Sequence, residues 1–330
     1  MKAVIWTKYG SPDGLHLQEV ETPTPNDNEV LVKIHAATAS RADTEFRDLK
    51  LPILFAIPIR IYLGVIRPTR VKILGTEFAG EVVATGKDVT QYHKGDQVYG
   101  YTGLGMGTYA EYICLGEKPS ALASVMSKRP TNISYEEAAA VPFGGLEALH
   151  SLDRANIQRG QKVLIVGAGG SIGTYSVQLA KHYGAEVTGV DNGGKLDMLR
   201  SIGADHVIDY TREEYTKNGR KYDVIMDTIG GSPFGGSVRS LNENGTYLNV
   251  NPKMTHRLQM AWSKGKSNKK LLSWEGSYTT KNLLRLKELV EAGTIKPVID
   301  RRYPLEQIAE AHRYVETDQK KGNVVITIAT

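Results

Sequence analysis

The segment 163–180, VLIVGAGGSIGTYSVQLA, places four glycines between an apolar run and a helical pattern. Small residues let the chain turn tightly there, and the first backbone amides of the following helix point at an anion. The strict G-x-G-x-x-G spacing is not met, because Ala168 stands at the first glycine position. We nevertheless expect the loop to hold a pyrophosphate. The residues expected to line it are Gly167, Ala168, Gly170, Ser171, Ile172 and Gly173.

A second chemical feature is the acid that ends the next apolar run, AEVTGVD. Asp191 lies 18 residues beyond Gly173, where a carboxylate can accept hydrogen bonds from both ribose hydroxyls of a dinucleotide. A 2′-phosphate about 4 Å away would be disfavoured by ~1 kcal/mol in water-like to ~4 kcal/mol in protein-like surroundings. Asp191 therefore favours NADH. Lys195 and Arg200 are near enough in sequence to offset this charge, which keeps NADPH as the alternative.

The elements that must position these residues change character along the chain. Residues 1 to about 125 carry short alternating runs such as EVLVKIHAATA and GEVVATG, separated by turn-forming stretches, which is typical of antiparallel β-structure. From about 130, almost wholly apolar strands alternate with helices, as in a parallel sheet covered on both faces. The last runs, VIDRRYP and NVVITIA, are β-rich again and are expected to complete the first domain. The predicted fold class is α/β.

A series of motifs then matches a known family along essentially the whole chain. GTEFAGEVVATGKDV, GDQVYG, GTYAEY, AAAVPFGGLEALHSL and GADHVIDY occur in that order. The chain thereby resembles the medium-chain dehydrogenase/reductase superfamily, most closely its zinc-independent, quinone oxidoreductase-like branch. The resemblance implies a GroES-like β-rich catalytic domain at 1–126, completed by about 293–330, and a doubly wound Rossmann domain at 127–292. It also implies hydride transfer in the interdomain cleft and homodimers, with KLLSWEG as the pairing edge strand.

The zinc-binding pattern of the alcohol dehydrogenases in this superfamily is missing here. Ser40 stands for the cysteine ligand, Thr76 for the histidine and Phe143 for the third ligand, while Ala42 replaces the proton-relay hydroxyl. Neutral hydroxyls and a phenyl ring are not the ligands that zinc takes, so we expect no metal. The remaining site suits hydride addition to a quinone or an α,β-unsaturated carbonyl, which needs orientation and hydrogen bonds to the developing oxyanion.

Site candidates follow from these motifs and the resemblance. The catalytic candidates are Ser40, Asp43, Thr76, Phe143 and Tyr62. On the cofactor side, Lys195 is a candidate because it lies near Asp191 in sequence, and the resemblance adds Tyr210, Thr228 and Gly230. Structural alternatives stay open: Asp43 as a loop tie, Phe143 as a core aromatic, and Tyr62 as one packing residue among 17 tyrosines. Glu77, a carboxylate inside an apolar stretch, is expected to be at least partly buried and hydrogen-bonded, because burying it unpaired is costly.

Composition limits which other types of protein and partner the chain fits. A single cysteine excludes an internal disulfide, and the 41 basic and 36 acidic residues are interspersed, which argues against DNA as a partner. The N-terminus has no secretory pattern, so cytoplasm is expected. The apolar run 51–66 is too short for a bilayer span and is interpreted as buried or cleft-lining, with a membrane-surface contact as the alternative. Two other functions stay open: a zinc alcohol dehydrogenase with atypical ligands, and a non-catalytic NAD(P)H- or RNA-binding protein.

Overall fold

The computed structural model describes residues 1–49, 53–119, 124–263, 268–276 and 278–328 of the chain. It divides into two compact units. Unit 1 comprises residues 1–143, 278–291 and 297–330, and unit 2 comprises residues 144–277 and 292–296. Among the described residues, no helix is both long and apolar enough to cross a membrane.

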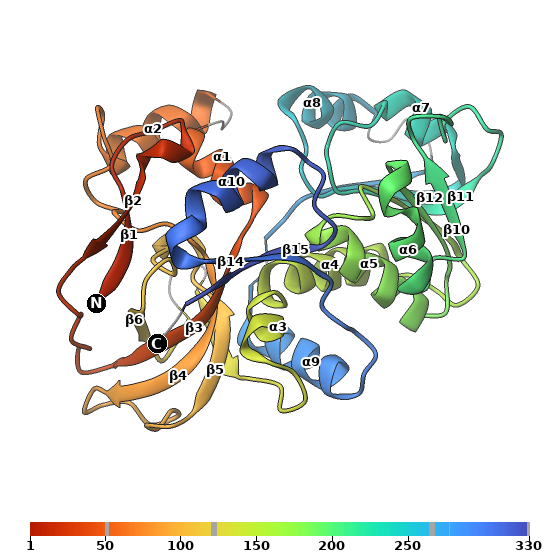
Figure 1. Cartoon of the computed structure of the whole chain (residues 1–330). Coiled ribbons are helices and arrows are strands. Elements are labelled where there is room, and N and C mark those ends of the chain that lie inside the picture. Colours follow the sequence, from red (N-terminus) through yellow and green to blue (C-terminus); the bar gives the residue numbers. More distant parts are fainter. Residues whose placement is uncertain (50–52, 120–123, 264–267, 277, 329–330) are drawn as a thin grey trace. The chain divides into compact units, whose positions relative to one another are not determined.

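Unit 1 is built on a seven-stranded sheet (Figure 1). Its order is β14-β15-β3-β4-β5-β7, and β6 pairs with β3 off this path. The bounds are β3 Glu29–Ala39, β4 Glu77–Thr85, β5 Gln97–Tyr101, β6 Tyr112–Gly116, β7 Val125–Lys128, β14 Ile299–Pro304 and β15 Asn323–Thr327. Alternation along β3 buries Val30, Val32 and Ile34 in the core. The predicted return of the C-terminal runs is confirmed, because β15 pairs with β3.

A hairpin and several helices complete unit 1. They are β1 Lys2–Trp6, β2 Leu15–Glu19, α1 Arg41–Asp48, α2 Ile53–Leu63, α3 Tyr135–Ala139, α9 Thr280–Glu291, α10 Ile308–Glu316 and the first residues of α4 Pro142–Ala155. Short 3₁₀ turns lie at Pro12–Gly14, Gly103–Gly105 and Leu305–Gln307 in this unit and at Gly193–Lys195 in unit 2.

Unit 2 is a six-stranded parallel sheet in the order β10-β9-β8-β11-β12-β13. This is the doubly wound order: the chain first adds strands on one side of β8, then crosses over and adds the remaining strands on its other side, beginning with β11. Its strands are β8 Lys162–Val166, β9 Glu186–Asp191, β10 His206–Asp209, β11 Tyr222–Asp227, β12 Leu241–Asn249 and β13 Lys270–Ser273. Its helices are α5 Ser171–His182, α6 Leu196–Ser201, α7 Phe234–Arg239, α8 Met254–Ser263 and most of α4. The predicted α/β class, with a GroES-like sheet and a Rossmann sheet, is confirmed.

The unit boundaries differ from those expected from the motifs. Residues 127–143 group with unit 1, because β7 pairs with β5 and the Tyr135 ring stacks on His35 of β3 at 4.4 Å. Helix α9 also groups with unit 1, where the Tyr99 hydroxyl donates to the Leu283 carbonyl.

One expectation from the sequence concerns the apolar run 51–66. The run is helical in part, and its described side chains from Ile57 to Tyr62 are mostly exposed, so they are not buried in a core; the cleft-lining role stays a prediction.

Candidate active site

The dinucleotide turn of unit 2 joins β8 to α5 as the glycine spacing predicts. Gly167 has φ +76°, and a Cβ on Gly173 would lie 2.3 Å from the Gly167 carbonyl oxygen. Only glycine lets the helix approach the strand this closely. Gly170 is the N-cap of α5 and offers no side chain to its first amides. The turn can therefore accept a pyrophosphate at the positive end of the helix dipole.

Asp191 ends β9 beside this turn and is almost fully buried. Its Oδ2 accepts from the Gly169 amide at 2.8 Å, and its Oδ1 accepts from the Asn192 amide at 2.9 Å. The Lys195 ammonium lies 3.2 Å from the same Oδ1, and both side chains are buried. The carboxylate is thus fixed at the strand end, with its charge compensated inside the protein.

The other cofactor-side candidates follow neighbouring strand ends. Tyr210 follows β10, and its amide donates to the Asp191 carbonyl, while its side chain is exposed. Thr228 follows β11 and donates to the carbonyls of Val166 and Gly167. Gly230 has φ +65°, and a Cβ there would lie 1.7 Å from the Asn251 carbonyl oxygen. The structure thus gathers Gly167, Asp191, Tyr210 and Thr228 at the carboxyl edge, around the point where strand order reverses.

A buried aspartate that sequence reasoning missed holds this edge together. Asp227, the last residue of β11, accepts hydrogen bonds from the amides of Ile229, Gly230 and Ser232 and from the Tyr247 hydroxyl. It fixes the loop that carries Gly230. An acid ending the apolar run YDVIMD was the available signal, the same signal that identified Asp191.

Unit 1 holds the acceptor-side candidates, beginning with Ser40 and Asp43. Ser40 caps α1 in a capping box, and the Asp43 Oδ2 accepts from both the Ser40 amide at 2.9 Å and its hydroxyl at 2.6 Å. The Thr76 hydroxyl makes a longer contact, 3.4 Å, to Asp43 Oδ1. Burial raises the pKa of Asp43 to about 6 despite these hydrogen bonds. The structure thus brings together three of the five catalytic candidates.

Glu77 begins β4 beside this cluster and is buried, as expected. Its Oε2 accepts from the Thr38 hydroxyl, and its Oε1 accepts from the Phe143 amide at 2.7 Å. Burial raises its pKa to about 7, against the effect of those two hydrogen bonds. The carboxyl therefore ties β3, β4 and the start of α4 together. The Phe143 ring is half-buried, and its centroid lies 5.6 Å from that of Tyr101.

A hydrogen-bonded chain behind Asp43 was not foreseen. The Tyr109 hydroxyl bonds to Asp43 and contacts His312 Nε2 at 3.1 Å, while His312 Nδ1 contacts the Arg47 guanidinium at 3.2 Å. Because Arg47 can only donate, Nδ1 accepts, so the neutral imidazole carries its proton on Nε2 and donates to Tyr109. Tyr109 then donates to Asp43. Burial, and secondarily Arg47, lower the His312 pKa to about 3, which keeps this order of donors fixed at neutral pH.

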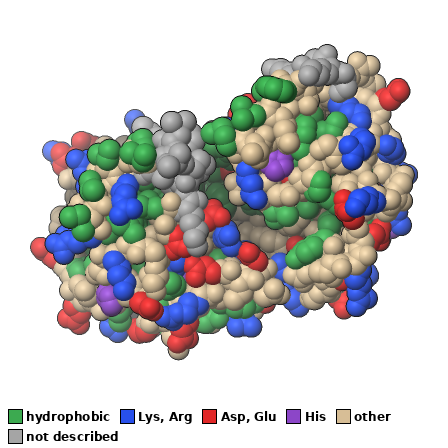
Figure 2. All heavy atoms as spheres, turned by 90° about the horizontal axis from the view of Figure 1, so that it is seen from above, with side chains coloured by type: hydrophobic (Ala, Val, Ile, Leu, Met, Phe, Trp, Pro, Cys, Tyr) green, Lys and Arg blue, Asp and Glu red, His purple; other side chains and the backbone are tan. Residues whose placement is uncertain are grey.

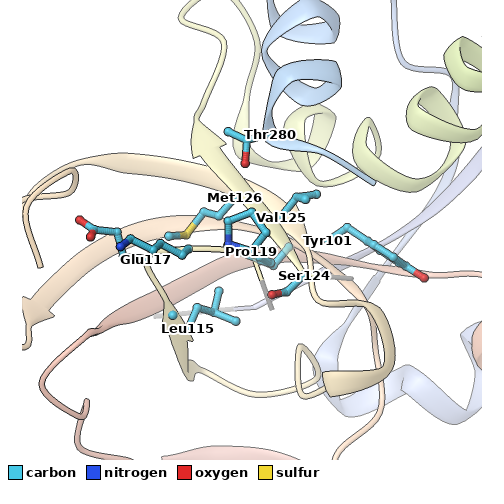
Figure 3. A pocket seen from close by; sticks show the side chains of 11 residues that line it. Tyr101, Leu115, Glu117, Pro119, Ser124, Val125, Met126 and Thr280 are labelled. Atoms are coloured by element: carbon cyan, nitrogen blue, oxygen red, sulfur yellow. The ribbon is translucent and has the colours of Figure 1, made fainter. Parts of the chain in front are cut away.

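Other candidates lie apart from this cluster. The Tyr62 side chain is exposed on α2, with the Arg70 guanidinium 5.0 Å from its ring centroid. Glu147 is buried, and its carboxylate accepts from the Trp274 indole at 3.0 Å. Figure 3 shows a narrow pocket near Tyr101, Val125, Met126 and Thr280. The volume of this pocket, about 10 Å³, corresponds to roughly one water molecule.

The donor types at the zinc positions do not fit a metal. Ser40, Thr76 and Phe143 provide two neutral hydroxyls and a phenyl ring, and the neighbouring Asp43 and Glu77 carboxyls are engaged by protein donors. In the described part of the chain, no group of three or more His, Cys, Asp or Glu side chains is arranged to hold a metal ion.

Comparison with known proteins covers both units. Residues 26–124 match the alcohol dehydrogenase GroES-like domain, and residues 202–326 match a family described as zinc-binding dehydrogenase. A 2-methylene-furan-3-one reductase of Solanum lycopersicum is 33% identical, covering 99% of this chain and 79% of the relative. An NADPH-dependent alkenal/one oxidoreductase of Arabidopsis thaliana is 30% identical with the same coverages. A solved quinone oxidoreductase from Coxiella burnetii aligns at TM-score 0.88 and 28% identity, over 100% of this chain and 99% of that one.

Proposed function

Because the chain belongs to the medium-chain dehydrogenase/reductase superfamily, in its quinone oxidoreductase-like branch, we propose that it reduces quinones or α,β-unsaturated carbonyls with NAD(P)H. One observation carries the proposal. The glycine turn of unit 2 has the tight backbone packing that a dinucleotide site needs, with Gly173 against the Gly167 carbonyl. In unit 1, Ser40, Thr76 and Phe143 stand where zinc-dependent relatives have their metal ligands.

On the acceptor side we assign the hydroxyls of Ser40 and Thr76 to the oxygen that gains negative charge. When bound, NAD(P)H supplies the hydride. A hydroxyl that donates to the developing oxyanion stabilises it more than it stabilises the neutral carbonyl, which accelerates the reaction. Asp43 acts through Ser40: while ionised it holds the Ser40 proton, and once protonated it can donate to Ser40 and free that hydroxyl for the acceptor.

We further propose that turnover needs no zinc. Zinc does not take the side chains at Ser40, Thr76 and Phe143 as ligands, and the neighbouring carboxyls of Asp43 and Glu77 are engaged by protein hydrogen bonds. A zinc alcohol dehydrogenase with atypical ligands would show stoichiometric zinc by elemental analysis and would lose activity with a chelator.

For the coenzyme, we propose a modest preference for NADH set by Asp191 and Lys195. The isolated carboxylate would repel a 2′-phosphate, but the lysine at 3.2 Å neutralises it. We therefore place the preference near the weak limit, about fivefold, equivalent to ~1 kcal/mol. Both NADH and NADPH should then support turnover.

The direct test is a spectroscopic assay of reduced nicotinamide with a panel of small quinones and enones. The proposal expects coenzyme oxidation that depends on the acceptor and persists in chelator. No turnover across the panel, with RNA binding that the dinucleotide displaces, would favour the non-catalytic alternative. On the face shown in Figure 2, basic and acidic side chains are interspersed, which does not support an RNA groove there.

Assembly and compartment remain proposals. We propose a homodimer that pairs through β13, because it is the edge strand of the unit 2 sheet. Light scattering of the purified protein tests the mass. Cytoplasmic residence is likewise proposed, to be checked by fractionation of the native cell.

A further inference from the structure

Of the stretches that contain no acidic residue, two also carry Lys and Arg and expose several large apolar side chains; we call them the acid-free segments: residues 49–76 and residues 244–274. The first holds five Lys and Arg residues and the second holds six. Together they contain eleven of the chain's 41 basic residues and none of its 36 acidic residues. The rest of the chain carries 30 basic and 36 acidic residues, so these two segments more than account for the net charge of +5.

The first acid-free segment lies in unit 1 and exposes apolar side chains. Helix α2 and the turn after it leave Ile57, Ile61, Val65 and Ile66 exposed, Ile66 by 88%. Figure 2 shows hydrophobic side chains reaching the surface over this unit, on the left of the view. Arg60 folds back on the turn, donating to the Val65 carbonyl at 2.8 Å. Cations thus lie beside exposed aliphatic groups.

The second acid-free segment lies in unit 2 and repeats this design independently. Helix α8 packs on its unit through His256 and Met260. Its opposite face carries Met254, Leu258 and Trp262, spaced four residues apart and all exposed, Trp262 by 77%. Because residues four apart share a helix face, they form one apolar stripe that the core does not use. Lys253 and Arg257, also exposed, flank it.

We propose that the described surfaces of the acid-free segments, residues 53–76 and residues 244–263, dock the protein on an anionic lipid surface. Exposed Trp and aliphatic side chains next to Lys and Arg, without carboxylates, are the composition of an interfacial membrane element. A nucleic acid would need the cations but not the aliphatic stripe. A second copy docked segment to segment would bring two positive surfaces together, which is unfavourable. Anionic lipid satisfies both features, the charge and the apolar side chains.

The inference extends the proposed function to its acceptor. It rests on that function in one respect only: an enzyme seated on a membrane can take a lipid-soluble quinone from the bilayer. The docking itself depends on the surface alone and can be measured without any turnover.

The test is co-flotation of the full-length protein with phosphatidylcholine vesicles, with and without phosphatidylglycerol. The protein should float only with the anionic vesicles. Arg67→Gln and Arg257→Gln should each weaken binding about fivefold, as expected for one surface cation near anionic lipid. Ile66→Ser and Trp262→Ser should each weaken it by about tenfold. Matched controls outside the segments are Arg220→Gln and Leu284→Ser, both at exposed positions, which should bind as the parent does.

Each outcome decides one claim. The docking proposal is overturned if the protein binds neutral vesicles equally well, does not bind anionic vesicles, or loses as much vesicle binding in the control variants. It is also overturned if the protein dimerises with rising concentration and Trp262→Ser or Ile66→Ser abolishes the dimer. Turnover of a water-soluble quinone, measured on the same preparations, separates the two proposals. Turnover without flotation leaves the reductase and removes the docking; flotation without turnover does the reverse.

Discussion

Replacing Glu77 by glutamine should change how the stability of the protein depends on pH. The carboxyl is buried between the Thr38 hydroxyl and the Phe143 amide, and burial raises its pKa from 4.5 to about 7. Between those two pH values the folded protein keeps the proton while the unfolded chain has lost it. Stability contributed by Glu77 is therefore present below about pH 4.5 and is lost as pH rises to about 7.

The size of this effect follows from the difference between the two pKa values. It corresponds to about 3 kcal/mol of unfolding free energy across the interval. Buried His312 works in the opposite direction: its pKa is lowered to about 3, so the unfolded chain takes up a proton first as pH falls. Only the difference between variant and parent isolates Glu77. That difference, parent minus Glu77→Gln, should shrink by up to ~3 kcal/mol as pH rises from 4.5 to about 7.

Urea unfolding followed by fluorescence gives these free energies, since Trp6 is buried in the same unit. Asp209→Asn is the control, because hydrogen bonds from Thr211 hold the Asp209 pKa below its usual range and its effect appears only at lower pH. The kcat of Glu77→Gln should stay within a few-fold of the parent. A difference that is flat with pH, or a large fall in kcat with the fold intact, refutes the reasoning that Glu77 is a structural tie.

Three further predictions concern the site. Ser40→Ala should lower kcat about a hundredfold, the cost of one lost oxyanion donor, with little change in coenzyme Kd; an unchanged kcat would remove Ser40 from the mechanism. Lys195→Met should leave the Asp191 charge uncompensated. The preference for NADH over NADPH, measured as the ratio of their Kd values, should then rise from about fivefold toward a hundredfold or more. An unchanged ratio would contradict the assigned ion pair. Gly173→Ala should abolish NADH binding and destabilise the protein, because its Cβ would meet the Gly167 carbonyl at 2.3 Å; calorimetric NADH binding equal to the parent would contradict the close approach.

Local signals in the sequence were enough to predict the dinucleotide turn. Gly167, Gly170 and Gly173 lie within one turn between a strand and a helix, and their spacing reflects the close approach itself. Asp191 was likewise predictable, because an acid at the end of an apolar parallel strand lies at the carboxyl edge of the sheet, where such folds bind their ligands. The carboxyl ends of parallel strands then brought Tyr210 and Thr228 to the same edge.

The chain behind Asp43 could not be predicted in this way. Arg47 and His312 are 265 positions apart, and Tyr109 and His312 are 203 apart, so only the return of the C-terminal strands to the first sheet brings them together. No periodicity encodes such a contact. For the described part of the run 51–66, only the expected burial failed. Apolar composition favours burial, but it does not tell which helix face lacks a partner.

The central claim, hydride delivery to a conjugated acceptor, is tested most directly by isotope transfer. The measurement uses reduced nicotinamide carrying deuterium at C4, on the face that the enzyme uses, with a small enone in the presence of chelator. We expect one deuterium per molecule on the β-carbon of the saturated product. Coenzyme oxidation without deuterium in the product, or transfer that stops in chelator and returns with zinc, would contradict it.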